Sequence, residues 1–283
     1  MNAFSSFLLG LVQGIAEFLP ISSSGHLALF QTFFGMENME EKYMFFTVLL
    51  HFGTLISVCM VYWRDIVDMI REFFLGIAAL AGRKDTGVAP PPARRMVMLI
   101  IIATVPLFVM VFLQDAVNQL FSNSIMVSCA LLATGFILFF SDRMARGHKT
   151  AKNATVADAL IVGCGQALAV IPGLSRSGTT ISVGMMRGFD RAFAVRFSFL
   201  MSLPAVLGAN VLEIKDALAS NFPIEELPMY LVGVAVSAVV GYFAIRLVKS
   251  LSDKGKFGKF AYYCWAVGLG SLVAGIVKMM LLK

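Results

Sequence analysis

Residues 13–26 read QGIAEFLPISSSGH and place a carboxylate, a proline, three serines, a glycine and a histidine inside an otherwise apolar segment. Before this polar stretch, residues 3–18 would form a helix about 24 Å long, shorter than the hydrocarbon core of about 30 Å. Pro20 ends that helix, and residues 24–35 form a second short apolar piece. This order of helix, polar turn and helix predicts a re-entrant hairpin, whose irregular backbone is tolerated at membrane depth only beside protein or a water-filled cavity.

The composition indicates a polytopic membrane protein. Of the 283 residues, 58% are hydrophobic and 14% are charged, and the mean hydropathy is +0.82. Soluble chains carry about 25% charged residues. We therefore predict an all-α fold with a single membrane domain over residues 1–283. The net charge of +6 does not indicate a nucleic-acid partner, because in a membrane chain the position of the charges matters more than their sum.

A second polar stretch suggests that the chain is duplicated, because residues 155–187 repeat the broken pattern around Pro172. Shifting the first hairpin by 153 residues places Gly10, Gln13, Ser24 and Gly25 on Gly163, Gln166, Ser177 and Gly178. Full spans are expected at about 43–63, 96–114, 125–141, 196–213, 229–247 and 260–280. Repeat one (about 1–141) and repeat two (about 155–283) would each hold a hairpin plus three transmembrane helices. Because that is an odd number of crossings, the second copy must lie upside down, which predicts an inverted-topology repeat.

The positions of the charges predict the orientation. Of the 23 Lys and Arg residues, 18 lie at 64–95, 142–152, 187–196 and 246–259, all on one side of the expected topology. Acidic residues occupy the other side at 37–41 and at Glu213, Asp216, Glu225 and Glu226. By the positive-inside rule the basic segments are cytoplasmic, both termini are outside, and the longest segment, 64–95, is a cytoplasmic loop. The two polar turns would then meet near the midplane from opposite faces.

The first turn offers acid–base and nucleophilic groups. Gln13 and Glu17 are four residues apart and share a helix face, and a carboxylate at membrane depth, which costs about 2.5–3.5 kcal/mol, is a functional hypothesis. The alternative is that Glu17 only pairs with Arg176 to hold the hairpins together. The hydroxyls of Ser22, Ser23 and Ser24 could be nucleophiles or helix caps, and His26 could be a general acid/base or a hydrogen-bonded core residue.

The second turn is suited to an anion. Arg176 at the start of a helix can bind phosphate through its guanidinium, with help from backbone amides and the helix dipole. The surrounding candidate substrate-binding residues are Gly173, Ser175, Ser177, Gly178 and Thr180. Phosphate binding beside Glu17 and hydroxyls favours phosphoryl transfer on a lipid head group. The alternatives are a transporter or flippase of an anionic or lipid-phosphate substrate, whose architecture is similar, and a purely structural membrane protein.

The stretches at 13–26 and at 172–182 (PGLSRSGTTIS) closely resemble the two signatures of the bacterial undecaprenyl-pyrophosphate phosphatase family, the bacitracin-resistance type, and the resemblance covers essentially the whole chain. It implies hydrolysis of undecaprenyl diphosphate to undecaprenyl phosphate plus phosphate, which recycles the lipid carrier for peptidoglycan synthesis. It also implies a multi-pass protein of the bacterial plasma (inner) membrane, with an active site that opens to the periplasmic or outer side.

The resemblance also assigns roles to residues. Glu17 and Gln13 match the acidic motif, Ser23 the nucleophile, His26 the catalytic histidine, and Ser175, Arg176 and Thr180 the second signature. A divalent cation, Mg²⁺ or Ca²⁺, is implied as cofactor. One carboxylate supplies too few oxygen ligands for such an ion. We therefore expect Glu17 and the substrate diphosphate to bind the cation together. The expected partners are the isoprenoid diphosphate lipid and membrane lipids, with a homodimer as an open alternative to a monomer.

Overall fold

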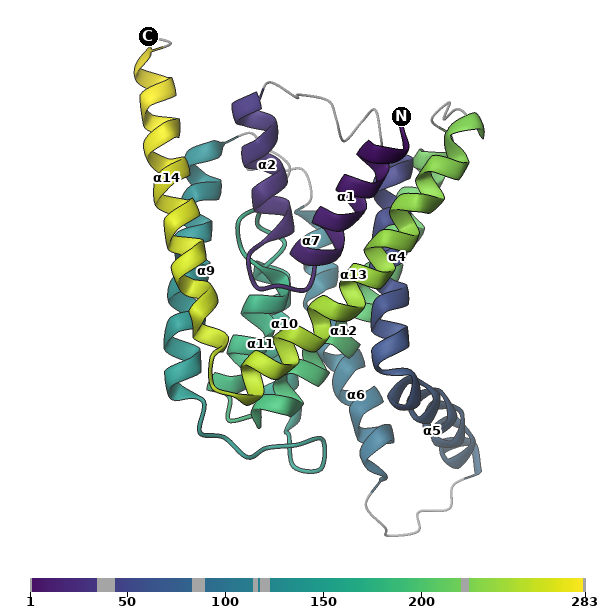
Figure 1. Cartoon of the computed structure of the whole chain (residues 1–283). Helices are drawn as coiled ribbons and strands as arrows, with labels where there is room; N and C mark the ends of the chain where they lie inside the picture. The colour runs from purple at the N-terminus through teal and green to yellow at the C-terminus, as the bar shows by residue number, and fades with distance from the viewer. Residues whose placement is uncertain are drawn as a thin grey trace.

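The computed structural model describes residues 2–34, 44–82, 90–113, 117, 123–219 and 224–281, and the named elements in these ranges are all helices (Figure 1). The first half contains α1 (Ala3–Ala16), α2 (Ser23–Phe34), α4 (Met44–Val61), α5 (Trp63–Gly82), α6 (Pro92–Thr104), α7 (Leu107–Phe112) and α9 (Ser124–Met144). The second half contains α10 (Val156–Leu168), α11 (Arg176–Met186), α12 (Arg191–Ala219), η1 (Ile224–Glu226), α13 (Leu227–Asp253), η2 (Phe257–Lys259) and α14 (Phe260–Leu281).

Five helical segments in the described part of the chain are long and apolar enough to cross a membrane. They are Pro92–Phe112, Ser124–Met144, Arg191–Val211, Leu227–Asp253 and Phe257–Leu281. A sixth is obtained if α4 and α5, which meet at an angle of 87°, are counted as one bent span. The predicted multi-pass helical membrane protein is confirmed at this level. The span expected at 96–114 is built from two helices, α6 and α7, which meet at Pro106.

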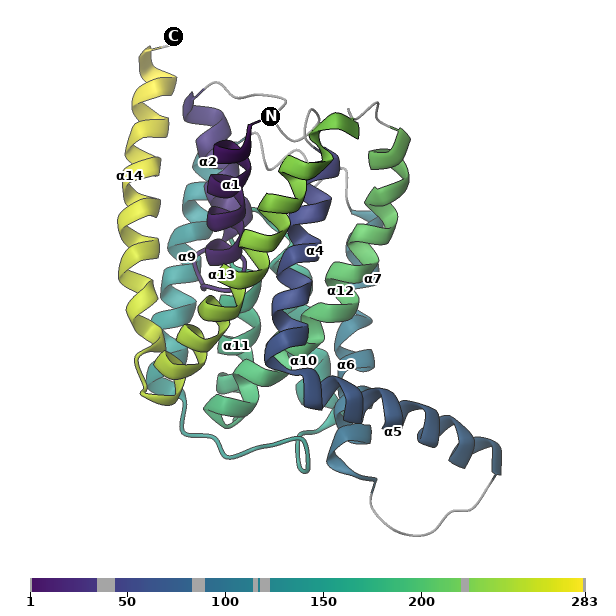
Figure 2. The same ribbon diagram turned by 45° about the vertical axis from the view of Figure 1, so that its right-hand side comes forward.

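Helix α5 lies where the charge pattern predicted a loop. Residues 63–82 form this helix, which leaves the bundle almost at a right angle to α4 (Figure 2). The apolar side chains of Trp63, Val67, Ile70, Phe74 and Ile77 recur every three or four residues and stay exposed, which is the pattern of an amphipathic helix. The six basic residues of 64–95 predict a loop, but they do not prevent a helix with this apolar periodicity. Residues 83–89 and the acidic stretch 37–41 lie outside the described residues.

Two pairs of short helices project their connecting turns into the middle of the molecule. In Figure 1 the turn after α1 and the turn that joins α10 to α11 lie close together near mid-height of the molecule. Helix α1 packs on α13 so closely that a Cβ atom at Gly10 would overlap the backbone of Gly233. Helix α10 packs on α6 in the same way, because a Cβ atom at Gly163 would overlap the backbone of Ala103. Each of these two short helices therefore packs through a glycine against a candidate membrane span, Leu227–Asp253 for α1 and Pro92–Phe112 for α10.

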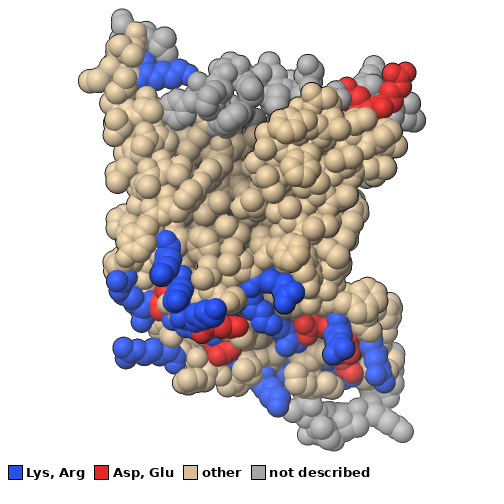
Figure 3. Space-filling view, viewed as in Figure 1, with Lys and Arg blue, Asp and Glu red and all other residues tan. Residues whose placement is uncertain are grey.

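Charged side chains gather at one end of the molecule, the lower end in Figure 3. We call it the basic end, and it contains the ion pairs Arg187–Asp158, Arg191–Asp142 and Arg196–Asp65. At this end the buried Asp158 carboxylate also forms a salt bridge with the Lys149 Nζ atom at 2.8 Å. These contacts fix the start of α10. Between the two ends the surface in Figure 3 is almost free of charge. Such an apolar band, with side chains such as that of Phe112 89% exposed, fits contact with lipid tails.

Candidate active site

The two polar turns touch each other through glycines. A Cβ atom at Gly25 would lie 2.8 Å from the Cα atom of Gly173. Gly173 has a φ of +97°, a left-handed backbone conformation that residues with a side chain rarely adopt. On the other side of the contact, a Cβ atom at Gly178 would lie 3.1 Å from the ring of Pro20. The glycines predicted as binding residues thus have a clear packing function, which is to let the two turns meet.

Two serines cap the helices that leave the turns. The hydroxyl of Ser22 accepts a hydrogen bond from the amide three residues later at 3.1 Å, and Ser175 does the same at 3.1 Å. Ser24 and Ser177 lie 3.4 Å from these capping hydroxyls, one in each turn. The helix-cap alternative therefore holds for Ser22 and Ser175. Ser22 adopts a positive φ of 67°, which is unusual for a residue with a side chain.

Glu17 is the centre of the polar contacts. Its Oε1 atom accepts a hydrogen bond from Arg176 at 2.5 Å, and its Oε2 atom accepts from Gln13 at 3.2 Å and from the Ser23 hydroxyl at 3.3 Å. The Nε2 atom of His51 lies 4.0 Å from the same Oε2 atom. The Glu17 side chain is only 9% exposed, so a charge placed there needs these partners. The ion pair between the hairpins, which the structural alternative predicted, exists.

A small cavity of about 60 Å³ lies between the two turns. Half of the predicted site residues line it, namely Glu17, Ser22, Ser23, Ser24, Ser175 and Arg176. The remaining wall is apolar and comes from Ala16, Ala169 and Leu174. The cavity therefore brings a cation from the second turn, a carboxylate from α1 and hydroxyls from both turns to one place, where they can contact the same phosphate group.

His26 lies differently from what a Ser23–His26 pair requires. Its Nδ1 atom is 2.8 Å from the Ser22 carbonyl oxygen, and its Nε2 atom is 2.8 Å from the Tyr263 hydroxyl on α14. The two rings are stacked with their centroids 5.6 Å apart. Among the described residues no hydrogen bond joins His26 to Ser23 or Glu17. In this structure the hydrogen-bond partner that can take a proton from Ser23 is the Glu17 carboxylate.

Two other predicted residues strengthen the scaffold and do not line the cavity. Ser177 donates to the Leu19 carbonyl of the opposite turn at 3.4 Å. Thr180 donates to the Arg176 carbonyl at 2.8 Å and lies 2.5 Å from the Ser198 hydroxyl on α12. Because Thr180 is buried against α12, it fixes the helix that carries Arg176.

Three site residues on other helices were missed by the sequence analysis as parts of the site. His51 on α4 and Tyr263 on α14 contact Glu17 and His26, as described above. Thr134 on α9 donates to the Gly173 carbonyl at 3.0 Å and accepts from the Ser175 amide at 3.2 Å. A polar residue in an apolar span was the available signal for His51 and Thr134, but sequence spacing alone does not show which turn such a residue reaches.

The described residues do not form a metal site of their own. No group of three or more His, Cys, Asp or Glu side chains in the described ranges could hold a metal ion. The single carboxylate, Glu17, is already paired with the Arg176 guanidinium, which would repel a divalent cation beside it. The donor set fits a cation only if substrate phosphate oxygens supply further ligands.

Comparison with known proteins places the chain in a family. The family model described as "Bacitracin resistance protein BacA" matches residues 6–270. An undecaprenyl-diphosphatase of Alkaliphilus metalliredigens is 42% identical over 95% of this chain and 97% of its own length. Proteins of the same name from Methanosphaera stadtmanae and Halothermothrix orenii are 38% and 39% identical over 98% of this chain and 99% and 100% of their own lengths. This chain belongs to the bacitracin resistance protein BacA family.

Proposed function

We propose that the protein is an undecaprenyl-diphosphatase, which hydrolyses undecaprenyl diphosphate to undecaprenyl phosphate and phosphate. The observation that carries the proposal is that Ser23, from the first turn, and Arg176, from the second, share the carboxylate of Glu17 beside one small cavity. The name of the full-length relatives, undecaprenyl-diphosphatase, gives the substrate and the reaction. The single membrane domain suits a substrate that is itself a membrane lipid.

Substrate binding begins with Arg176. This residue starts α11, and the first amides of a helix have no acceptor within the helix. A terminal phosphate in the cavity would therefore meet the guanidinium, the free amides and the positive end of the helix dipole together. As the guanidinium turns toward the phosphate, Glu17 loses part of its ion pair. Its carboxylate becomes a better proton acceptor at the moment when the substrate is in place.

The chemical step uses Ser23 and Glu17. The Ser23 oxygen attacks the terminal phosphorus, its proton passes to Glu17 Oε2, and the bond from phosphorus to the bridging oxygen breaks. Undecaprenyl phosphate leaves, and water then cleaves the phosphoserine to release phosphate. Direct attack by a water molecule that gives its proton to Glu17 is the alternative. A divalent cation bound jointly by Glu17 and the diphosphate would supply neutralisation of phosphate charge.

His26 has a positioning role in this proposal. Its contacts to the Ser22 carbonyl and to Tyr263 fix the first turn of α2, on which Ser23 stands. The same contacts leave no hydrogen bond between the imidazole and Ser23. Our proposal therefore gives the general-base role to Glu17, while the acid/base role of His26 stays a prediction. Gln13 orients the Glu17 carboxylate through its 3.2 Å hydrogen bond.

We infer that the two halves are inverted repeats whose hairpins enter the membrane from opposite faces. The inference is supported by the paired serine caps, which lie 153 residues apart, and by the glycine contacts of α1 with α13 and of α10 with α6. The basic end then faces the cytoplasm, and the active site opens toward the outer side of the plasma membrane. Single cysteines introduced at Lys259 and at Glu225 test this orientation. An impermeant thiol reagent should label the first from the cytoplasmic side and the second from the outer side.

Transport of an anionic lipid is the second candidate function, because opposed broken hairpins are typical of secondary transporters. A transporter does not need a nucleophile beside a base, whereas hydrolysis does. The decisive experiment is phosphate release from undecaprenyl diphosphate by the protein purified in detergent, where no transmembrane gradient exists. Release that depends on Ser23 and Glu17 supports hydrolysis, and binding of the lipid without release supports transport.

A further inference from the structure

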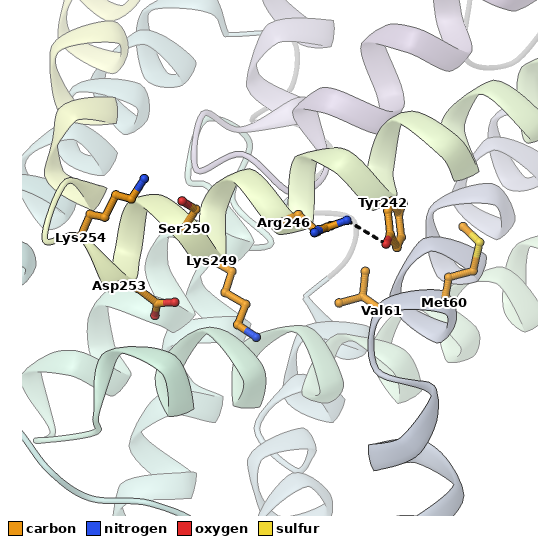
Figure 4. Close-up of a pocket in the computed structure, with 8 residues that line it drawn as sticks. All are labelled: Met60, Val61, Tyr242, Arg246, Lys249, Ser250, Asp253 and Lys254. Atoms are coloured by element: carbon orange, nitrogen blue, oxygen red, sulfur yellow. Dashed lines mark hydrogen bonds between the residues drawn. The ribbon is translucent and has the colours of Figure 1, made fainter.

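A second and larger cleft lies away from the candidate active site. Its volume is about 520 Å³, and it lies between the end of α13 and the end of α4 (Figure 4). The lining residues are Met60, Val61, Tyr242, Arg246, Lys249, Ser250, Asp253 and Lys254. Five of these residues, at positions 242, 246, 249, 250 and 253, lie on one face of α13, and Lys254 follows directly after the helix. None of them takes part in the catalytic proposal.

The cleft carries unneutralised positive charge. Arg246, Lys249 and Lys254 line the cleft together with one carboxylate, Asp253, and within the described ranges none of the three cations forms a salt bridge. Asp65 is close enough to interact with Lys249, but it is already paired with Arg196. The cleft therefore holds an excess of positive charge, which favours an anionic ligand.

Hydroxyl groups supplement these charges. The Arg246 guanidinium donates to the Tyr242 hydroxyl at 3.1 Å and lies 5.5 Å from the centre of that ring. Figure 4 shows the Arg246 guanidinium pointing along α13 toward the Tyr242 hydroxyl. Ser250 lies between Arg246 and Lys254 along the same face. Guanidinium, ammonium and hydroxyl donors in one cleft suit the oxygens of a phosphate diester.

The border of the cleft is apolar. Met60 is 46% exposed at its edge, and on α13 the exposed side chains of Val239, Phe243 and Leu247 lead away from it into the apolar band. The cleft lies at the end of the candidate span Leu227–Asp253, where the charge-free surface meets the basic end (Figure 3). Tyrosine is enriched at this level of a membrane, and basic pockets there bind anionic head groups. The ligand therefore needs an anionic head and apolar chains.

We infer that this cleft binds the head group of an anionic glycerophospholipid, with the phosphate between Arg246 and Lys249 and the acyl chains along α13 and α4. A zwitterionic lipid is a poorer ligand because its ammonium group would enter a cleft that is already positive. A soluble phosphate would use the same donors but gain nothing from the apolar border. Phosphatidylglycerol and phosphatidylcholine with identical acyl chains are therefore the probes.

The test is native mass spectrometry of the detergent-purified full chain titrated with each lipid. The wild-type protein should retain phosphatidylglycerol at least about tenfold more strongly than phosphatidylcholine. The variant Arg246→Gln/Lys249→Gln/Lys254→Gln should lose this preference. A matched control, Arg146→Gln/Lys256→Gln/Lys259→Gln, removes one arginine and two lysines from exposed positions outside the cleft and should keep it.

Three outcomes would overturn the assignment. They are equal retention of both lipids by the wild-type protein, an equal loss of preference in the cleft variant and the control, and displacement of phosphatidylglycerol by an equimolar amount of inorganic phosphate. The wild-type comparison does not depend on any variant. If the triple variant unfolds, the single variant Lys249→Gln should still weaken phosphatidylglycerol binding severalfold, and unchanged binding would contradict the inference.

Discussion

Glu17 and Arg176 form an ion pair of 2.5 Å although they are 159 residues apart in the chain. The pair joins the C-terminal end of α1 to the first residue of α11, and it lies at the cavity between the two turns. A pair used only to hold the hairpins together would need charge but not a particular geometry of the cation. If Arg176 turns from Glu17 to bind the substrate phosphate, it needs the planar guanidinium, which can donate two parallel hydrogen bonds.

Arg176→Lys separates these two roles. It keeps a cation beside Glu17 but removes the bidentate fork, so we expect a loss of about 10²–10³-fold in kcat/KM for phosphate release. The chain should still fold, as judged by its thermal unfolding in detergent. Arg146→Lys, at an exposed position, is the matched control and should behave like the wild type. Wild-type kcat/KM in Arg176→Lys would show that the guanidinium does not act on the substrate.

The three serines of the first turn should respond differently to alanine substitution. Ser22→Ala removes a helix cap and should lower the free energy of unfolding by about 1 kcal/mol. Ser23→Ala removes the nucleophile and should lower kcat by at least about 10²-fold with the stability unchanged. Ser24→Ala is the control within the same cavity and should have the smallest effect on kcat. If Ser23→Ala and Ser24→Ala release phosphate equally fast, the nucleophile is not Ser23.

His51 should act as a positioning residue through Glu17. Its Nδ1 atom is bound to the Thr47 carbonyl at 3.0 Å, which aims Nε2 at the carboxylate. His51→Gln retains a polar group at this depth, whereas His51→Leu does not. We expect His51→Leu to lower kcat about tenfold with little change in KM, and His51→Gln to recover most of that loss. Equal kcat in both variants and the wild type would remove His51 from the site.

The cation should be needed for activity but not for folding. Chelation with EDTA should abolish phosphate release, and added Mg²⁺ or Ca²⁺ should restore it, because the substrate phosphates complete the coordination. The unfolding temperature of the substrate-free protein should not change on chelation, since the described residues offer no separate metal cage. A fall in that temperature would indicate a cation held by the protein alone.

Asp158 makes the stability of the basic end depend on pH. Burial alone would raise the pKa of Asp158, but hydrogen bonds from Lys149, Thr155 and Arg187 outweigh burial and lower the pKa from 3.8 to about 2. Because the folded pKa is the lower one, the contribution to stability is complete well above pH 3.8 and is lost as the pH falls toward about 2. It amounts to about 2 kcal/mol, less in high salt because Lys149 and Arg187 are partly exposed.

Thermal unfolding in detergent measures this contribution. Asp158→Asn should unfold at a lower temperature than the wild type near pH 7, and the difference should narrow as the pH falls below about 4. Asp190→Asn is a control at the same end, because that carboxylate forms no salt bridge within the described ranges. A difference between wild type and Asp158→Asn that stays constant down to low pH would show that the carboxylate charge is not the cause.

Local patterns were sufficient to predict much of the fold and of the site. Pro20 and Pro172 interrupt apolar helices beside serines and glycines, and these two turns are the ones that meet. Hydropathy predicted five of the candidate spans, and the sixth expected span, 43–63, counts only as part of the bent pair of α4 and α5. The basic charges of 64–95 predict a loop, whereas the apolar residues of 63–82 recur at helical spacing and form the amphipathic helix α5.

The residues that the sequence did not resolve depend on long-range packing. Tyr263 contacts His26 across 237 residues, and it takes both the ring face and the Nε2 atom that an acid/base role would have used. Thr180, which is predicted to bind substrate, lies buried against the Ser198 hydroxyl of α12, a contact that no sequence spacing indicates. Which of several neighbouring hydroxyls faces a cavity and which caps a helix is decided by the packing of helices far away in the sequence.

The most direct test of the account is the rate of phosphate release from undecaprenyl diphosphate by detergent-purified Glu17→Gln compared with the wild type. Glutamine keeps the size of the side chain and one acceptor oxygen, but it replaces the other acceptor with a donor and cannot take the proton of Ser23 or of water. The account predicts a loss of about 10²–10⁴-fold with the protein still folded. Release at the wild-type rate would contradict it, because Glu17 would then be only one half of a structural ion pair.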